Sequence, residues 1–418
     1  MTAEAEAVVA RYYVESYFDL AHAAAVLAGE QSTGTFVRVR GETDALRARH
    51  GATVVEVEHL EPRATPSLPG ATKPPGAARV NAGHVAIRFP LENFGPSLPN
   101  LLAAVAGNLF ELQELAGIRL LDLDLPEAFA ARYPGPRFGI AGTRMLADAT
   151  TGPLVGSIIK PSVGLSPDEH ARLVGELAEA GADFCKDDEL LANPPYSPLR
   201  ERVRTVMAAV ERAERTTGRR LMYAFNITDD IENLERNYEI VRDAGGTCVM
   251  ACINLIGLTG ISYLRSFCEL PIHGHRAMIG ALMRHPSQGI AFRAYQKLAR
   301  LAGVDHLHTS GMNNKFYETN DEVAASVRDV LTPMLGGYSC LPVLSSSQWA
   351  GTAEPTYALT HTTDVLMVCG GGIHAHPGGV AAGIESVRQG WEAAVAGIPL
   401  RSYADGRTAL REAIETFA

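Results

Sequence analysis

The chain has 418 residues, of which 46% are hydrophobic and 20% are charged, a composition typical of a globular protein with a large core. Its formal net charge of -10, with no run of lysines and arginines, argues against nucleic acid as a partner. No apolar stretch reaches the roughly 18 residues of a membrane span, the acidic first residues do not resemble a signal peptide, and the six cysteines lack paired spacing. We therefore expect a cytoplasmic protein without a membrane partner.

Residues 1–135 interleave strand-like and helical segments. Apolar and β-branched runs at 7–14 and 52–57 predict strands, and alanine- and leucine-rich stretches at 20–28 and 100–105 predict helices. This mixture predicts a smaller α+β domain of the ferredoxin-like type.

Two proline-rich segments punctuate this region. Five prolines between residues 61 and 79 indicate an exposed loop. The run Tyr-Pro-Gly-Pro-Arg at 133–137 indicates a domain boundary, which gives domains at 1–135 and 136–418.

From about residue 150 the sequence alternates short apolar runs with amphipathic helical stretches. Such a series over about 265 residues matches the size of a (β/α)8 TIM barrel, and an open doubly wound sheet is the alternative. The eight candidate strands lie at residues 154–159, 182–185, 221–225, 248–253, 271–274, 304–307, 341–344 and 365–368.

Each expected strand ends on polar residues or glycines. In a barrel the carboxyl ends of the strands meet at one mouth, where such enzymes carry their chemistry. We therefore expect one active site formed by Lys160, Lys186 with Asp188 and Glu189, Asn226, Asn254, His275 with Arg276, His308, Ser345, and the glycines Gly370, Gly371 and Gly372.

The run Lys186-Asp187-Asp188-Glu189 follows the second expected strand. In isolation such a run is more often a solvated charged turn. At a barrel mouth its carboxylates predict a magnesium site, because hard divalent cations take oxygen ligands. A neutral lysine amine can also capture CO2 as a carbamate, which adds a third anionic oxygen donor.

Lysines and histidines at other strand ends supply acid-base groups. Lys160 could carry protons or stabilise a developing enolate, although a lysine that reaches into solvent is the alternative. His275 and His308 could contact substrate or could be satisfied core histidines. The polar loop at 309–315 could close over substrate and carry Lys315 at its edge.

Several residues at the mouth suit a phosphate group. Arg276 could grip a phosphate with two hydrogen bonds, with a salt bridge as the alternative. Gly370 and Gly371 precede a helical stretch whose amides could bind the anion, with a plain turn as the alternative. Ser345 and Ser346 add hydroxyl donors. Together, these groups favour removal of a proton alpha to a carbonyl, with a metal holding the enediolate.

Several motifs in the same order resemble the large subunit of RuBisCO, over about residues 12–379. They lie at 156–166, 181–189, 273–278 and 305–308. The resemblance implies that Lys186 is carbamylated and that Lys186, Asp188 and Glu189 bind Mg2+.

The segments 30–35 and 107–110 resemble two N-terminal segments that, in this family, reach into the barrel of a partner subunit. The resemblance therefore implies a homodimer with shared active sites, to which Glu30, Thr35 and Asn108 contribute.

Other positions depart from the carboxylases of this family. Ser162 stands where they carry a second lysine, Ile279 where they carry a histidine, Phe36 where a tryptophan is usual, and Ser346 and Ser347 where they carry two glycines. The closing-loop signature is also altered around Lys315. The segment 133–140 resembles the RuBisCO-like, or form IV, proteins, which indicates that this chain is not a true carboxylase.

Within form IV, the methionine-salvage enolases place a catalytic lysine where this chain has Asn108. The resemblance thus favours a Mg2+-dependent lyase or isomerase that enolises a phosphorylated keto sugar or 3-oxo sugar-acid phosphate, with carbon–carbon cleavage. Lys160 would transfer protons, Asn108 and Lys315 would stabilise oxyanions, His275 and His308 would orient substrate, and Arg276 with Gly370 and Gly371 would hold one phosphate.

Three alternatives remain open. The first is a methionine-salvage enzyme, acting as 2,3-diketo-5-methylthiopentyl-1-phosphate enolase or methylthioribulose-phosphate isomerase. The second is residual ribulose-1,5-bisphosphate carboxylation, and the third is a non-catalytic ligand-binding relative.

Overall fold

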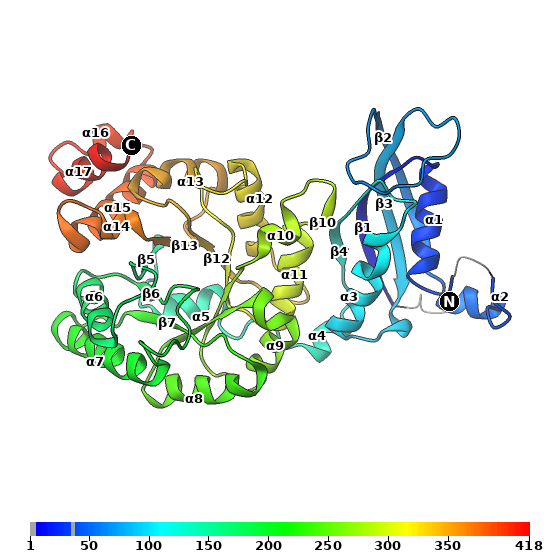
Figure 1. Cartoon of the computed structure of the whole chain (residues 1–418). Coiled ribbons are helices and arrows are strands. Elements are labelled where there is room, and N and C mark those ends of the chain that lie inside the picture. Colours follow the sequence, from blue (N-terminus) through cyan, green and yellow to red (C-terminus); the bar gives the residue numbers. More distant parts are fainter. Residues whose placement is uncertain (1–5, 35–37) are drawn as a thin grey trace. The chain divides into compact units, whose positions relative to one another are not determined.

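The computed structural model describes residues 6–34 and 38–418 (Figure 1). The chain divides into two compact units. The first contains the chain up to Pro134 together with Met278–Leu301, and the second contains Gly135–Ala277 and Ala302–Ala418. Met278–Leu301 includes strand β10 (Gln288–Ile290), which pairs in parallel with β4 (Gly117–Asp124) of the first unit.

The sheet of the first unit has the strand order β10-β4-β1-β3-β2 within the described residues. Strands β4, β1, β3 and β2 pair antiparallel to one another in this order. Helix α1 (Leu20–Glu30) lies between β1 and β2 in the chain, and α3 (Leu98–Ala106) lies between β3 and β4. This β-α-β-β-α-β order confirms the expected α+β domain of ferredoxin-like type. The remaining strands are β1 (Ala7–Ser16), β2 (Thr53–Arg63) and β3 (Val80–Pro90).

Alternate residues of β1 and the apolar side of α1 form the core of this unit. Val8, Ala10 and Tyr12 on β1 are buried, as are Leu20 and Leu27 on α1. Burying these side chains contributes about 25 cal/mol for each Å2 of apolar surface removed from water. The remaining elements of this unit are α2 (Asp44–His50), η1 (Leu91–Asn93), η2 (Asn108–Glu111), α4 (Ala128–Arg132), α10 (Ile279–Met283) and α11 (Phe292–Ala302), whose last residue falls in the second unit.

The expected loop at 61–79 starts later than the prolines suggested. Strand β2 continues through Pro62 to Arg63. It lies at the edge of the sheet, where a proline costs no ladder hydrogen bond on its open side.

Parallel strands of the second unit close into a barrel, in the order β11-β12-β13-β5-β6-β7-β8-β9 over the described residues. All of the candidate strands are confirmed, with ends shifted by a few residues, and the open-sheet alternative is wrong. The strands are β5 (Leu154–Ile158), β6 (Phe184–Lys186), β7 (Met222–Asn226), β8 (Cys248–Cys252), β9 (Ile272–His275), β11 (His306–His308), β12 (Leu341–Leu344) and β13 (Leu366–Cys369).

Two buried aspartates stand directly before β6 and β11, which start later than expected. An Asp183 carboxylate oxygen accepts a hydrogen bond from Val155 N at 2.8 Å, and Asp305 accepts one from Ile272 N at 2.9 Å. The aspartate backbones bond to the same neighbours, since Asp183 N donates to the Val155 carbonyl and Asp305 N to the Ile272 carbonyl, both at 2.9 Å. Each aspartate thus ties the start of its strand to the neighbouring strand through both side chain and backbone.

Helices form the outer layer around the barrel strands (Figure 1). Ser166 and Glu169 form a capping box at the start of α6, and Thr319 and Glu322 form one at the start of α12. The helices of this unit, besides the one-turn η3 (Ile231–Asn233) and η4 (Ala350–Thr352), are α5 (Gly139–Leu146), α6 (Pro167–Glu179), α7 (Leu199–Thr217), α8 (Leu234–Asp243), α9 (Ile253–Phe267), α12 (Asn320–Leu331), α13 (Ala353–Thr360), α14 (Gly371–His374), α15 (Gly379–Ala396), α16 (Leu400–Tyr403) and α17 (Thr408–Phe417).

The barrel interior is apolar near the amino-terminal ends of its strands. There Leu154, Phe184, Met222 and Leu341 belong to one buried cluster. All six cysteines are buried free thiols. None of the helices in residues 6–34 and 38–418 combines the length and apolar character needed to cross a lipid bilayer.

Candidate active site

The carboxyl ends of β5, β6 and β9 bring together two lysines, two carboxylates and a histidine. Lys160 Nζ lies 2.6 Å from Asp188 Oδ2, and Lys186 Nζ lies 3.6 Å from Glu189 Oε2. His275 Nε2 lies 3.5 Å from the same Glu189 oxygen. These residues, which lie up to 115 positions apart in the sequence, thus share one cluster at the barrel mouth.

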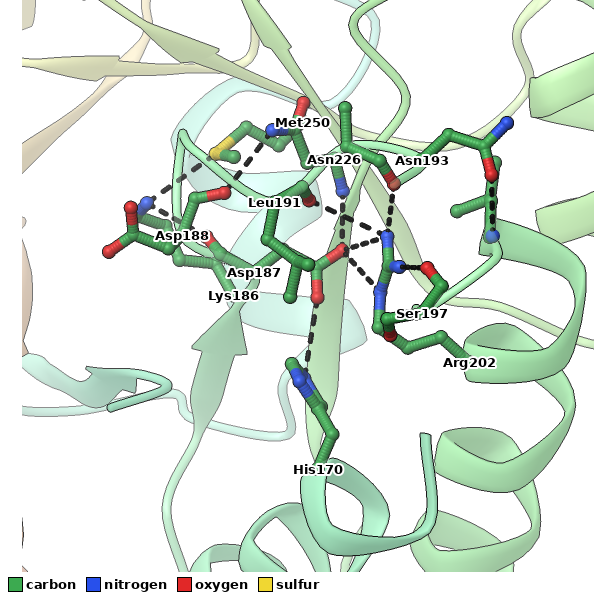
Figure 2. A network of polar contacts seen from close by, with 12 residues as sticks. His170, Lys186, Asp187, Asp188, Leu191, Asn193, Ser197, Arg202, Asn226 and Met250 are labelled. Atoms are coloured by element: carbon green, nitrogen blue, oxygen red, sulfur yellow. Dashed lines mark hydrogen bonds and ion pairs between the residues drawn. The ribbon is translucent and has the colours of Figure 1, made fainter. Parts of the chain in front are cut away.

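Lys186 is almost completely buried, with 1% of its surface exposed. Its Nζ donates to the Asp187 carbonyl at 3.0 Å and contacts Met250 Sδ at 3.5 Å (Figure 2). Lys160 is more open, with 37% of its side chain exposed, and its Nζ also donates to Ser162 Oγ at 2.8 Å. The two lysines therefore differ: one lines the wall of the barrel and the other reaches into the mouth.

Asp187, between the expected metal ligands Lys186 and Asp188, is turned away from the mouth and is fully buried. Its carboxylate accepts hydrogen bonds from Tyr223 OH at 2.7 Å and Asn226 N at 2.8 Å. Arg202, also fully buried, donates to the same carboxylate at 3.2 and 3.3 Å, and His170 Nε2 lies 3.3 Å from it (Figure 2). These contacts anchor the turn that carries Asp188 and Glu189.

Burial sets the charge of the groups around Asp187. It lowers the pKa of His170 to about 4 and raises the pKa of Tyr223 well above its usual value. Both side chains are thus neutral near pH 7, and Arg202 is the cation that balances Asp187. Sequence reasoning missed His170, Arg202 and Tyr223, because nothing local relates them to the Lys-Asp-Asp-Glu run.

Asn226, expected at the mouth, also supports this turn. Its side-chain amide donates to the Asp188 carbonyl at 3.2 Å and to the Glu189 carbonyl at 3.3 Å. Asn254 donates instead to the Ala277 carbonyl at 2.7 Å, between the β8 and β9 ends. Both asparagines therefore hold backbone segments of the mouth in place.

The donor set fits a magnesium ion only with one addition. Asp188 and Glu189 supply two carboxylates, and no group of three or more histidine, cysteine, aspartate or glutamate side chains is spaced for a metal in residues 6–34 and 38–418. Lys186 Nζ lies beside Glu189, and a carbamate on that nitrogen would add the missing anionic oxygen. The residues thus fit Mg2+ if Lys186 is carbamylated.

Of the histidines of β9 and β11, His273, His306 and His308 are buried, and the His275 side chain is 13% exposed. Burial lowers the pKa of His275 and His308 well below the usual value, so both rings are neutral. His308 Nε2 lies 2.8 Å from His273 Nε2, and His308 Nδ1 lies 3.0 Å from Ser345 Oγ. Both ring nitrogens of His308 thus have protein partners, and its expected role toward substrate stays a prediction.

Arg276 does not point at a phosphate cradle in this structure. Its guanidinium donates to Glu318, with one contact at 3.0 Å, and the side chains of both residues are less than a tenth exposed. The salt bridge weighed from the sequence is therefore the one formed, but it is buried. It ties the end of β9 to the loop after β11.

Lys315 lies in that loop and is exposed. Its Nζ sits 5.7 Å from the Phe316 ring centroid, and Asn314 shapes the loop by donating to the carbonyls of Gly311 and Glu318 at 2.9 and 3.2 Å. The structure does not bring Lys315 into contact with Lys160 or the carboxylates.

The late strands β12 and β13 line the part of the mouth next to β5. Gly370 precedes the one-turn helix α14, and a Cβ on Gly370 would lie 3.3 Å from Lys160 Cε, so this glycine leaves room for the lysine. Ser346 and Ser347 have φ angles of 73° and 53°, in the left-handed region that favours glycine. The Ser346 hydroxyl is buried and has no protein partner among the described residues.

The N-terminal residues expected to enter a partner's site lie together on the first unit. Glu30 ends α1 and Asn108 begins η2, and both are exposed. A Cβ on Gly107 would lie 3.2 Å from Gln31 Oε1, so the two segments are neighbours. Thr35 and Phe36 fall outside the described residues.

Family models match nearly the whole chain. The model of the ribulose bisphosphate carboxylase large chain, catalytic domain, matches residues 139–417, and that of the N-terminal domain matches residues 1–129. The chain is similar to a Xanthobacter autotrophicus protein named 3-oxo-isoapionate-4-phosphate transcarboxylase/hydrolase, at 47% identity over 98% of this chain and 99% of that protein.

Two further relatives agree. A Rhizobium etli protein named 3-oxo-isoapionate-4-phosphate decarboxylase is 43% identical over 97% of this chain and 98% of its own length. The crystal structure of a rubisco-like protein from Burkholderia fungorum superposes with a TM-score of 0.92 at 46% identity, covering 98% of this chain and all of that one. These matches confirm the resemblance to RuBisCO-like proteins.

Proposed function

The chain belongs to the ribulose bisphosphate carboxylase large-chain family, and we propose that it is a RuBisCO-like, Mg2+-dependent enzyme that cleaves a carbon–carbon bond in a 3-oxo sugar-acid phosphate. The observation that carries this proposal is the cluster at the mouth, where Lys160 Nζ lies 2.6 Å from Asp188 beside the buried Lys186. The names of the X. autotrophicus and R. etli relatives support 3-oxo-isoapionate 4-phosphate as the substrate to test first.

Carbamylated Lys186, Asp188 and Glu189 would hold the ion. When bound, Mg2+ would stabilise negative charge on the oxygens of the substrate. The anchored Asp187 keeps the two neighbouring carboxylates facing the mouth, since its own carboxylate is bound by Arg202 and Tyr223. The chain therefore supplies a preorganised anionic site rather than a flexible acidic loop.

Lys160 is the proposed acid. In a decarboxylation, the bond between the carboxylate carbon and its neighbour breaks and CO2 leaves. The bonding electrons pass into the 3-oxo group to give an enolate. The ammonium of Lys160 then donates a proton to the carbon that lost CO2, and solvent reprotonates the amine. Such positioned proton transfer typically contributes a factor of about 100 to 10000 in rate.

We assign the phosphate to the backbone amides of Gly370 and Gly371. The first amides of α14 lie next to Lys160, as the close approach of Gly370 to the lysine shows. Ser345 and Ser346 stand at the adjoining strand end, where Ser345 is partly exposed and the Ser346 hydroxyl is buried. Arg276 is excluded from this assignment while Glu318 holds its guanidinium.

We also propose a homodimer with shared sites. Glu30 and Asn108 are exposed on neighbouring segments of the first unit. Their place suits residues that complete the site of a second copy. Sedimentation of the purified chain should give twice its 44.7 kDa mass, and a monomer that retains full activity would contradict this assignment.

The test of the proposed reaction is incubation with 3-oxo-isoapionate 4-phosphate, Mg2+ and bicarbonate. Decarboxylation should release one CO2 for each substrate consumed. Hydrolysis, favoured by the name of the relative with 47% identity, should instead give two organic products, one carrying 18O from labelled water. No consumption of substrate would overturn the proposal. Turnover of ribulose bisphosphate with labelled bicarbonate, or of the methionine-salvage phosphates, would replace it.

A further inference from the structure

A continuous line of hydrogen bonds runs through the barrel from helix α5 to the mouth. Thr143 Oγ1 lies 2.9 Å from His306 Nε2, and His306 Nδ1 lies 3.3 Å from His273 Nδ1. The line continues from His273 Nε2 to His308 Nε2 at 2.8 Å and from His308 Nδ1 to Ser345 Oγ at 3.0 Å. We name these five side chains the histidine line.

The histidine line is closed to solvent everywhere except at Ser345. Thr143, His273 and His306 are 0% exposed and His308 is 3% exposed, whereas Ser345 is partly exposed. Burial lowers the pKa of His306 to about 4 and those of His273 and His308 well below the usual value. Each ring is therefore neutral near pH 7 and carries one N–H donor and one acceptor nitrogen.

The direction of hydrogen-bond donation along the histidine line is determined at its Thr143 end. The Thr143 hydroxyl donates to the Gly139 carbonyl at 2.5 Å, one helical turn earlier in α5. Its only proton is used there, so its oxygen must accept from His306 Nε2–H. The same helix start is held in place by Asp305, which accepts from the amides of Phe138 and Gly139 at 2.6 and 3.1 Å.

The remaining bonds follow, because a neutral ring has one proton. His306 Nδ1 accepts, so His273 donates from Nδ1. His273 Nε2 then accepts from His308 Nε2–H, and His308 Nδ1 accepts from the Ser345 hydroxyl. The reversed direction would require Thr143 to donate to His306, and it would turn the Ser345 hydroxyl outward.

We propose that Thr143, His306 and His273 act as positioning residues that hold His308 as its Nε2–H tautomer, so that Ser345 donates inward and offers only acceptor lone pairs to the substrate. Such a serine recognises a substrate hydroxyl, which can donate, and disfavours a carbonyl or carboxylate oxygen at the same place. His308 thus acts through Ser345 rather than by touching substrate. The effect on turnover rests on the proposed function, whereas the tautomer does not.

The first experiment reads the tautomers directly. The full chain, with 15N-labelled histidine, is studied without substrate by long-range 1H–15N correlation of the ring signals, assigned with single histidine-to-glutamine variants. We expect Nε2–H at His306 and His308 and Nδ1–H at His273. Observation of His308 as the Nδ1–H tautomer in the native protein would overturn the proposal.

The matched variants are Thr143→Val, which removes the hydroxyl with little change of shape, and Thr143→Ser, which keeps it. Thr143→Val should convert the His308 signal to a mixture of tautomers, and Thr143→Ser should restore the native pattern. Thr356→Val is the control, since the buried Thr356 hydroxyl makes the same bond to a carbonyl one turn back, at 2.6 Å to Thr352, without a histidine partner. Native tautomers in a folded Thr143→Val protein would also overturn the proposal.

Kinetics supply a second readout. For the 3-oxo acid phosphate, Thr143→Val should lower kcat/KM by about tenfold, the scale of one misdirected buried hydrogen bond, and Thr143→Ser should recover it. An equal loss in Thr356→Val would show a general packing effect and contradict the proposal. If native protein does not turn over the substrate, the proposed function fails, but the tautomer test still decides this inference.

Discussion

The ammonium of Lys160 lies 2.6 Å from a carboxylate oxygen of Asp188, so the proposed proton donor and a proposed metal ligand form an ion pair across the ends of β5 and β6. An ion at Asp188 would draw this carboxylate away from the lysine. Metal binding at Asp188 would therefore release the Lys160 ammonium from this ion pair.

Replacing Lys160 with methionine should lower kcat at least about a hundredfold, because the acid is lost while the volume is kept. Mg2+ affinity, measured by calorimetry, should stay equal or rise, because a cation that competes for Asp188 is removed. Lys73→Met on the first unit is the control and should change neither quantity. A Lys160→Met protein with native turnover would rule out the assigned acid.

Replacing Lys186 with alanine or methionine should abolish Mg2+-dependent turnover, because the third anionic ligand cannot form. The native protein should show a carbamate signal in 13C NMR under labelled CO2, and Mg2+ with bicarbonate should raise its Tm. Both effects should vanish in the Lys186 variants and persist in Lys160→Met. A carbamate signal that survives in Lys186→Met would place the carbamate elsewhere.

Replacing Arg202 with methionine should destabilise the fold by about 3 to 5 kcal/mol, since it leaves Asp187 charged and unpaired in a buried place. Mg2+ affinity should fall by about tenfold to a hundredfold, because the turn that carries Asp188 loses its anchor. Denaturant titration and calorimetry measure the two effects. Adding Asp187→Asn should recover part of the stability.

The control for Arg202 is Arg172→Met, which breaks an exposed pair with Glu176 whose side chains are 65% and 43% exposed. Such surface pairs are worth less than about 1 kcal/mol. A similar small change in Arg202→Met would mean that the buried pair does not anchor the turn.

Replacing Ser346 with glycine should stabilise the protein by about 1 kcal/mol, because its φ of 73° strains a residue that has a Cβ. Denaturant titration at constant m-value measures this gain. Ser266→Gly, within helix α9, should have the opposite sign, with a loss of about 1 kcal/mol. If Ser346→Gly proves destabilising, the hydroxyl of Ser346 contributes more than the strain costs.

Stability should fall in mild acid, in part through His170. The pKa of this ring is 6.5 when exposed and about 4 in the fold, mainly because burial disfavours the charged form. Above pH 6.5 neither state takes up the proton, and between 6.5 and about 4 only the unfolded chain does. The free energy of unfolding should therefore fall with decreasing pH in this window, by about 1.4 kcal/mol per pH unit for one such group.

Denaturant titration of native protein and His170→Gln at several pH values measures how much His170 contributes to this loss of stability. The variant should lose less stability than native protein between pH 7 and 4.5, while the exposed control His59→Gln should follow the native slope. Equal slopes for native protein and His170→Gln would contradict the assignment. The neighbours that face the ring are Asp187, Arg202 and Tyr223.

Local sequence was sufficient for the barrel because each strand is a short apolar run that ends in polar residues, and that pattern needs no knowledge of partners. The strand ends Lys160, Lys186 and His275 were placed at one mouth by the geometry of parallel strands alone. The same reasoning started β6 and β11 too early, at segments that include Asp183 and Asp305, whose side chains bond to amides of the neighbouring strands.

Sequence by itself thus determined the family, the two kinds of fold and the set of chemical groups at the mouth, since these depend on residue type and order. Only the tertiary structure decided which groups touch. Arg276 is paired with Glu318, Asp187 is anchored by Arg202, and His308 is held between His273 and Ser345. Those pairings depend on strand register and burial, which bring together residues that no local pattern connects.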